Sequence, residues 1–147
     1  MLNYSPSVIN DRIADPRFEL IDAARYFYRQ DWMVGTAGNL SARLADDSFW
    51  ITASGKAKGE LSTNDFVRVA LDGTVLERAS TQIKPSAETI IHQAIYSLFP
   101  ATQACYHVHS IEANLASHFT NKDYLSLPPL EMIKGLGVWE ETPQVAI

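Results

Sequence analysis

The spacing of apolar residues predicts one amphipathic helix near the start of the chain, over residues 16–30. Asp15-Pro16 places a capping side chain before a proline, and proline is favoured at the first helical position. The apolar residues that follow recur on one helical face: Leu20, Ile21, Ala24, Phe27 and Tyr28. We expect this helix to pack against the core, because none of these residue types indicates chemistry.

Alternation of apolar and polar residues predicts two β-hairpins after this helix. The four predicted strands are 40–44, 49–53, 66–70 and 74–77. Asp46-Asp47 forms the turn of the first hairpin, and Asp72-Gly73, a dipeptide favoured in tight turns, forms that of the second. Between the hairpins, residues 61–65 predict a short capped turn.

Two more helices and a strand are predicted in the second half of the chain. One helix opens at Pro85–Glu88, with Ser86 as candidate N-cap, and Pro100 ends it. Its buried stripe is predicted to be Ile91, Ala94, Ile95 and Leu98. A buried strand follows over 104–109. Ser110 then caps a helix that is expected to turn three apolar side chains inward: Ile111, Leu115 and Phe119.

The order of these elements indicates the fold class. Two hairpins followed by helix, strand and helix favour an α/β or α+β fold with a largely antiparallel sheet flanked by helices. No Gly-x-Gly-x-x-Gly or P-loop pattern is present, so a dinucleotide-binding fold is not indicated. Residues 120–128 are expected to form a loop, 129–135 could be a strand end or a helical turn, and β character returns from Val138.

Composition limits the partners and the compartment. A chain of 147 residues is the size of one domain, which we take as residues 1–147. A net charge of −5 argues against non-specific binding to nucleic acid. The single cysteine excludes a disulfide within the chain and favours a reducing compartment. Because no long apolar run or signal peptide is recognised, we expect no membrane association and a cytoplasmic location.

The predicted strand 104–109 contains a His-x-His pair. Side chains alternate faces along a strand, so Ala104, Tyr106 and Val108 share one face, while Cys105, His107 and His109 share the other. The Cα atoms of the two histidines would lie about 6.6 Å apart, which allows both imidazoles to bind one zinc ion. By itself this spacing more often marks two polar side chains on a half-buried strand.

Three short loops could bind an anion. The loop 35–39 has two glycines that allow close approach of backbone N–H groups, and 52–56 combines hydroxyls, a glycine and a lysine. The third, 84–88, opens a helix whose free N–H groups suit an anion. Each also has a simpler explanation: an ordinary turn for the first two, and N-capping with Glu88 in the first turn for the third.

Two glutamates, Glu88 and Glu131, are candidates for proton transfer. Glu131 has apolar neighbours on both sides, and burial there would raise its pKa towards neutrality. A surface glutamate at a turn is the alternative. His92 and His118 fall within predicted helices and are expected to be packed or exposed residues rather than ligands. Cys105 shares the histidine face and is expected to be a buried, inert thiol.

Four motifs give the chain its resemblance to a known family: Gly-Thr-Ala-Gly-Asn-Leu-Ser at 35–41, Ile-Thr-Ala-Ser-Gly at 51–55, Lys-Pro-Ser-Ala-Glu at 84–88 and His-Val-His-Ser at 107–110. In this order they resemble the class II aldolase/adducin family, and the resemblance covers residues 16–147. It implies a three-layer α/β/α sandwich with a mainly antiparallel central sheet. It also implies a homo-oligomer, often a tetramer.

The resemblance also implies a site. One Zn²⁺ per subunit would be held by His107 and His109. The phosphate of a small sugar phosphate would be bound by residues of the three loops: Gly38, Asn39, Ser54, Gly55 and Ser86. Glu88 matches the glutamate that serves aldolases of this family as catalytic acid/base and as a metal contact.

The segment Leu-Glu-Met-Ile-Lys-Gly at 130–135 is most similar to that of the dehydratases of methionine salvage. It implies that Glu131 acts as acid/base on a phosphorylated ketose with a methylthio group, from which water is lost. A sugar-phosphate aldolase or epimerase that relies on Glu88, or a non-catalytic adducin-like module, is the alternative.

The chain departs from the family pattern at one point. Family members take a third metal-binding histidine from a later segment, and after His109 this sequence has only His118, to which the role does not transfer. Zinc enzymes use three protein ligands plus an open position. We therefore expect the chain to be a C-terminally shortened form with weak or no activity, in which Glu88 or Cys105 could assist the metal.

Overall fold

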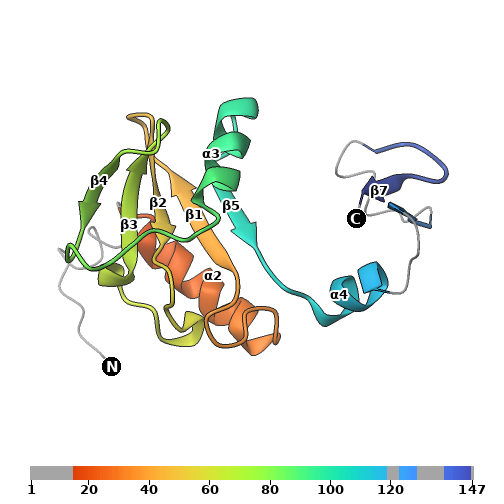
Figure 1. The fold of residues 1–147 in the computed structure, drawn as a ribbon, viewed down its shortest axis with the longest axis horizontal. Helices are drawn as coiled ribbons and strands as arrows, with labels where there is room; N and C mark the ends of the chain where they lie inside the picture. The colour runs from red at the N-terminus through yellow and green to blue at the C-terminus, as the bar shows by residue number, and fades with distance from the viewer. Residues whose placement is uncertain (1–14, 119–122, 129–137, 147) are drawn as a thin grey trace, which may run out of the picture. The chain divides into compact units, whose positions relative to one another are not determined.

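The structure, a computed structural model, describes residues 15–118, 123–128 and 138–146. The chain divides into two compact units, residues 1–109 and 110–147, which are described separately. The first unit contains the five-stranded sheet of Figure 1, in the order β4-β3-β2-β1-β5. All its pairings are antiparallel. Its strands are β1 (Asn39–Arg43), β2 (Ser48–Thr52), β3 (Phe66–Ala70), β4 (Val75–Arg78) and β5 (Ala104–His107).

Both predicted hairpins and the first predicted helix are confirmed. The helix α2 spans Arg17–Arg29, and the carboxylate of Asp15 accepts a hydrogen bond from the backbone N–H of Arg17. It covers one face of the sheet, where it forms an apolar core with β1, β2 and β3. That core contains Leu20, Ile21, Ala24, Met33, Leu40, Ala42, Trp50, Leu61 and Phe66.

The other face of the sheet is covered by α3 (Thr89–Leu98), which begins after the predicted opening at 85–88. Tyr96 packs there against Phe49, Ile51 and the valines of β3, so the unit has the three layers that were expected. The predicted buried stripe of α3 is wrong. Of the four predicted residues, Ile91, Ala94 and Leu98 are exposed and Ile95 is half-buried, whereas the buried residues of the helix are Thr89, His92 and Tyr96.

The reason for this reversal is hydrogen bonding. The polar face of α3 lies against Ser41 of β1, whose hydroxyl is 2.7 Å from His92 Nδ1 and 2.6 Å from Tyr96 OH. Buried polar groups are tolerated when they are paired in this way. Neighbouring positions on a helix differ by about 100° in direction, so burying His92 turns Ile91 outward.

The His-x-His strand was expected to be buried, but β5 lies at the edge of the sheet and pairs with β1 alone among the described strands. Tyr106 is therefore 45% exposed. The predicted division of its faces is confirmed. Tyr106 and Val108 pack on the α2 side, and Cys105 packs on the α3 side with Tyr96.

Two short 3₁₀ helices, η1 (Lys58–Glu60) and η2 (Thr63–Asp65), connect β2 to β3. The capped turn predicted at 61–65 is confirmed, because Ser62 and Asp65 cap each other reciprocally at η2. The helix η1 was not predicted.

The second unit contains α4 (Ile111–His118) and a pair of antiparallel strands, β6 (Tyr124–Ser126) and β7 (Gln144–Ala146). Ser110 caps α4 as predicted, since its hydroxyl accepts a hydrogen bond from Ala113 N–H at 3.0 Å. Ile111 and Leu115 are exposed rather than turned inward, because no described element of this unit packs extensively against α4. Residues 120–128, expected to be a loop, include β6. Phe119 and residues 129–135 lie outside the described residues. No described helix has the length and apolar character needed to cross a membrane.

Candidate active site

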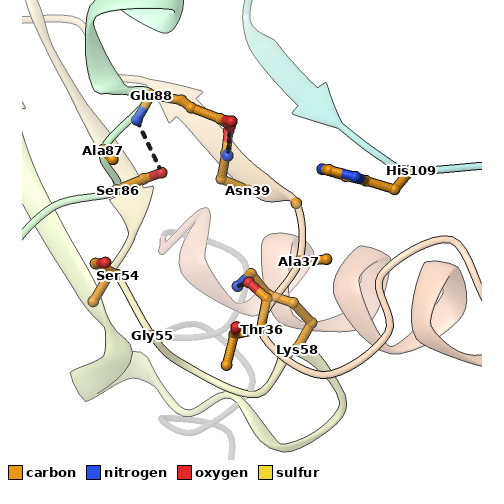
Figure 2. A pocket seen from close by; sticks show the side chains of 12 residues that line it. Thr36, Ala37, Asn39, Ser54, Gly55, Lys58, Ser86, Ala87, Glu88 and His109 are labelled. Carbon is orange, nitrogen blue, oxygen red and sulfur yellow. Dashed lines mark hydrogen bonds between the residues drawn. The ribbon is translucent and has the colours of Figure 1, made fainter. Parts of the chain in front are cut away.

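The three predicted anion-binding loops meet around one cavity of about 350 Å³ in the first unit (Figure 2). Its lining includes most of the predicted site residues: Gly38, Asn39, Ser54, Gly55, Ser86, Glu88 and His109. These residues come from the start of β1, the end of β2, the approach to α3 and the segment after β5. Their convergence favours a ligand site over three unrelated turns.

Backbone hydrogen bonds hold the loops together. Ser54 N–H donates to Lys84 O at 2.9 Å, and Ala53 forms an isolated β-bridge with Pro85. On the other side, Lys58 N–H donates to Gly35 O at 3.1 Å. The loop after β2 is thus fixed to both of the others, so the cavity is formed by the fold itself.

Gly38 is required at its position. It has φ +72°, in the left-handed region, and a Cβ there would lie 2.6 Å from the carbonyl oxygen of His107 and 2.7 Å from Met33 Cε. The glycine therefore allows the backbone before β1 to approach the end of β5. This close approach brings Asn39 level with His107 in the sheet register.

Lys58, which no sequence motif indicated, lines the same cavity and is 1% exposed. Its Nζ donates to the carbonyl oxygens of Thr36 and Lys56, both at 2.9 Å. In the part of the chain that the structure describes, no carboxylate forms an ion pair with it. Burial lowers the pKa of the ammonium group, because the charged form loses hydration. An anion in the cavity would supply the missing countercharge.

The two histidines lie on the same side of the sheet, as their spacing predicted. Their ring centroids are 4.7 Å apart, and His109 is anchored by its backbone N–H, which donates to Trp32 O at 2.8 Å. His107 lines a second cavity of about 240 Å³, which shares Asn39 and Glu88 with the first. Two imidazoles are donors that zinc prefers. Among the described residues, however, no group of three His, Cys, Asp or Glu side chains is arranged to hold a metal ion.

Glu88 lies between the two cavities, at the N-cap of α3. Its Oε2 accepts hydrogen bonds from Asn39 Nδ2 and, at 2.5 Å, from His107 Nδ1. Desolvation opposes ionisation of Glu88, but these two hydrogen bonds outweigh it and lower the pKa of the carboxyl group. Because His107 Nδ1 is used for Glu88, its Nε2 is the nitrogen left for a metal, an arrangement common in zinc sites.

His92 is buried behind this site rather than being a simple packed residue. Its Nε2 lies 2.5 Å from Asn39 Oδ1, which connects it directly to the cavity wall. Burial, followed by the nearby charge of His107, lowers the pKa of His92 to about 4. The spacing of Glu88, His92 and Tyr96, four residues apart on one helix, was the available sequence signal that these side chains share a face.

Three other residues considered as site candidates are Glu131, His118 and Cys105. Glu131 lies outside the described residues, so its predicted role stays a prediction. His118 is an exposed residue at the end of α4, in line with its helical assignment. Cys105 is half-buried, and burial raises the pKa of its thiol, which agrees with an inert cysteine.

The antiparallel sheet lies between two helical layers, and its polar cavity lies at the start of β1 and the end of β2. Residues 18–142 match the family described as "Class II Aldolase and Adducin N-terminal domain". The chain belongs to this family.

Individual relatives make the comparison more specific. A methylthioribulose-1-phosphate dehydratase of Microcystis aeruginosa is 65% identical over 133 residues, which are 90% of this chain and 65% of the relative. The protein of the same name from Leptospira biflexa is 46% identical over 136 residues, or 88% of this chain and 65% of the relative. The chain therefore spans about two thirds of the length of these curated relatives.

A solved structure confirms the fold. The L-fuculose-1-phosphate aldolase of Thermus thermophilus superposes with a TM-score of 0.61 and 28% identity, over 76% of this chain and 53% of that one. The expected fold class, α/β with a mainly antiparallel central sheet, is thus confirmed.

Proposed function

We propose that the chain carries the substrate-binding part of a metal-dependent dehydratase that converts 5-methylthioribulose 1-phosphate to the diketo phosphate in methionine salvage. The observation that carries this proposal is the single cavity in which the three loops, Glu88 and His109 converge. The printed names of the two relatives support the substrate. Because the family match spans both units, we also propose that residues 1–147 belong to one domain.

The cavity has the chemistry of a phosphate site. Glycine and hydroxyl residues surround it, and the buried ammonium of Lys58 supplies positive charge at its wall. Charge-assisted hydrogen bonds to a phosphate are stronger than neutral ones. A phosphate anchored here would place the sugar carbons towards Glu88 and His109, and this positioning reduces the entropic cost of the reaction.

His107 and His109 are the proposed protein ligands of a zinc ion. Two imidazoles on one side of a strand, one of them held by a carboxylate through its other nitrogen, fit a partial zinc site. When bound, the metal would polarise the substrate carbonyl and make the adjacent C–H more acidic. With two histidines alone, we expect the described residues to bind zinc more weakly than a three-ligand site.

The two candidate glutamates have different proposed roles. Glu131 would act as acid/base, by its resemblance to the dehydratases, and Glu88 would orient the substrate and His107. Ionised Glu88 is held by two donors, so it is better suited to accepting a hydrogen bond than to donating a proton at neutral pH.

The test is turnover of the dehydratase substrate by the chain and, in parallel, by a version extended to the full length of its relatives. Glu131→Gln should lower kcat at least about 100-fold, in the range of general acid–base catalysis. His107→Ala with His109→Ala should abolish zinc uptake measured by elemental analysis. If aldol cleavage is detected and Glu131→Gln leaves its rate unchanged, a sugar-phosphate aldolase or epimerase is favoured instead. A full-length protein without metal or turnover would favour an adducin-like module.

The phosphate site has its own test, which does not need turnover. Lys58→Met should weaken binding of inorganic phosphate at least about tenfold in calorimetry, since a charge-assisted hydrogen bond is worth about 1.5–3 kcal/mol. Arg29→Met removes one positive charge from an exposed position at the end of α2, outside the cavity, and should leave the affinity unchanged. Equal losses in the two variants would show that only net charge matters.

We further propose that the protein is a homo-oligomer, such as a tetramer, acting in the cytoplasm. Large apolar side chains remain exposed on α3, including Ile90 and Leu98, and they would be covered in an assembly. Light scattering after size-exclusion chromatography would give the mass directly, and a monomer at micromolar concentration would contradict the proposal.

A further inference from the structure

We propose that His92 is a positioning residue, which fixes the orientation of the Asn39 side-chain amide and thereby the hydrogen bonding of Glu88. The inference rests on the proposed role of Glu88 at the active site. It concerns His92, Ser41 and Tyr96, which are buried behind Asn39 and to which the proposed reaction assigns no role.

A continuous series of hydrogen bonds joins the interior of the α3 face to Glu88. Tyr96 OH lies 2.6 Å from Ser41 Oγ, and Ser41 Oγ lies 2.7 Å from His92 Nδ1. His92 Nε2 lies 2.5 Å from Asn39 Oδ1, and Asn39 Nδ2 bonds to Glu88 Oε2. Each member therefore contacts the next, from the buried phenol to the carboxylate.

The chemistry of the end group sets the direction of the whole series. An ionised carboxylate only accepts hydrogen bonds, so Glu88 requires the Nδ2 side of Asn39. Asn39 Oδ1 then faces His92, which must donate from Nε2. Neutral His92 consequently accepts at Nδ1 from the Ser41 hydroxyl, and Ser41 accepts from Tyr96. Every donor points towards Glu88.

Burial makes this direction hard to reverse. Asn39, Ser41, His92 and Tyr96 are at most 4% exposed, so water offers no alternative partner. An unpaired buried group would carry the full cost of its lost hydration. Burial also lowers the pKa of His92 to about 4, which keeps its ring neutral near pH 7 and leaves Nδ1 free to accept.

The functional consequence lies at the cavity wall. If the Asn39 amide were rotated by 180°, its Oδ1 would face the Glu88 carboxylate and two acceptors would repel each other. Glu88 would then lose one of the two donors that hold it beside His107. His92 thus acts on the site through Asn39, without touching the substrate itself.

Two substitutions separate this role from simple packing. In His92→Gln, the side-chain Nε2–H₂ can replace the imidazole donor to Asn39 but leaves the Ser41 hydroxyl without its acceptor. In His92→Asn, the side-chain oxygen can replace Nδ1 as the acceptor for Ser41 but leaves Asn39 Oδ1 unpaired. Each variant loses one buried hydrogen bond, so their stabilities should fall by similar amounts.

The first measurement is nitrogen–proton NMR of the full chain with labelled histidine and asparagine. We expect the His92 ring hydrogen on Nε2, and nuclear Overhauser contacts from the Asn39 NH₂ protons to the Glu88 side chain. In His92→Gln, the fold and the contacts between Asn39 and Glu88 should both persist. In His92→Asn, these contacts should be lost. A ring hydrogen on Nδ1 in the unmodified chain would overturn the proposal.

The second measurement uses the extended version that the turnover test above requires. His92→Asn should lower kcat roughly 10–100-fold with little change in KM, as for outer-shell partners of metal sites, and His92→Gln should restore most of it. Equal loss in both variants would mean a structural role only. Tyr96→Phe, which removes a buried hydrogen bond at the far end, should lower stability but keep the His92 tautomer. Because the NMR arm needs no turnover, failure of the proposed reaction would leave this test intact.

Discussion

The two faces of the sheet are packed by different means. On the α2 face, apolar side chains such as Leu20 and Ile21 meet Leu40, Trp50 and Phe66, and burial of apolar surface provides the stabilisation. On the α3 face, the buried residues of the helix are Thr89, His92 and Tyr96, and two of these three make side-chain hydrogen bonds to β1.

This difference shows where the fold serves stability and where it serves the site. Successive residues of β1 alternate between the faces, so Leu40 and Ala42 enter the apolar core while Asn39 and Ser41 meet α3. On the α3 face, burying polar groups has a desolvation cost, and a hydrogen-bond partner for each group offsets it. The result is an ordered set of donors that ends at Glu88, and Figure 2 shows its last hydrogen bond, from Asn39 to Glu88.

The largest expected effect tests this contrast with the same substitution on each helix. Leu20→Ala should lower the free energy of unfolding by about 2–5 kcal/mol, because Leu20 is 1% exposed in the apolar core. Leu98→Ala, at a residue 73% exposed on α3, should change it by less than about 0.5 kcal/mol. Urea unfolding measures both. Similar losses would mean that the two helices are packed alike.

The next effect is a pH dependence that arises on the α3 face. His92 in the unfolded chain takes up a proton near pH 6.5, whereas in the folded chain its pKa is about 4. Between these values the unfolded state binds more protons, so stability is full above pH 6.5 and falls as pH decreases. The loss should approach about 3 kcal/mol near pH 4, at about 1.4 kcal/mol per pH unit.

Urea unfolding between pH 7 and about 4.5 measures this slope, and His92→Gln should lack it. The groups that face His92 are Ser41, Tyr96 and Asn39, with the charges of Glu88 and His107 beyond them. The pKa of Glu88 is lowered from its ordinary value, so its own contribution is lost at lower pH than this window. Identical slopes in the two proteins would contradict the assignment to His92.

A smaller effect on stability concerns two glycines in the loops that line the cavity. Gly38 and Gly55 have similar positive φ angles, +72° and +70°, so alanine at either should cost about 1–2 kcal/mol from backbone strain. A Cβ at Gly55 meets no atom within 4 Å, whereas one at Gly38 meets the His107 carbonyl and Met33. Gly38→Ala should therefore be the more destabilising in thermal unfolding, and equal losses would show that the close approach is relieved cheaply.

The predictable part of the fold is the part whose burial is apolar. Period and turn residues located both hairpins. In α2 the predicted face includes the three buried residues Leu20, Ile21 and Ala24, although Tyr28 at its end is exposed. The same criterion failed on α3, where His92 and Tyr96 are buried through partners on a strand far away in sequence. It also failed on β5, because a strand's position in the sheet is not encoded in its own alternation.

The candidate site shows the same limit. Motifs identified its loops and the histidine pair, since those residue types are restricted by backbone geometry or by ligand chemistry. Lys58 was missed because a single lysine in a polar segment has no periodic context that signals burial. Lys58 lines the cavity because the loop 35–38 lies against η1 in the folded chain, a contact that the local sequence does not indicate.

The buried ammonium of Lys58 has a practical consequence for handling the protein. An anion that binds the folded cavity and not the unfolded chain shifts the folding equilibrium by mass action, by about 2.7 kcal/mol at one hundred times its dissociation constant. The melting temperature should thus depend on whether the buffer is phosphate or an amine, which supplies no buffer anion. Choice of buffer then becomes a thermodynamic variable, and a simple thermal-shift comparison of salts reports on the cavity before any substrate is made.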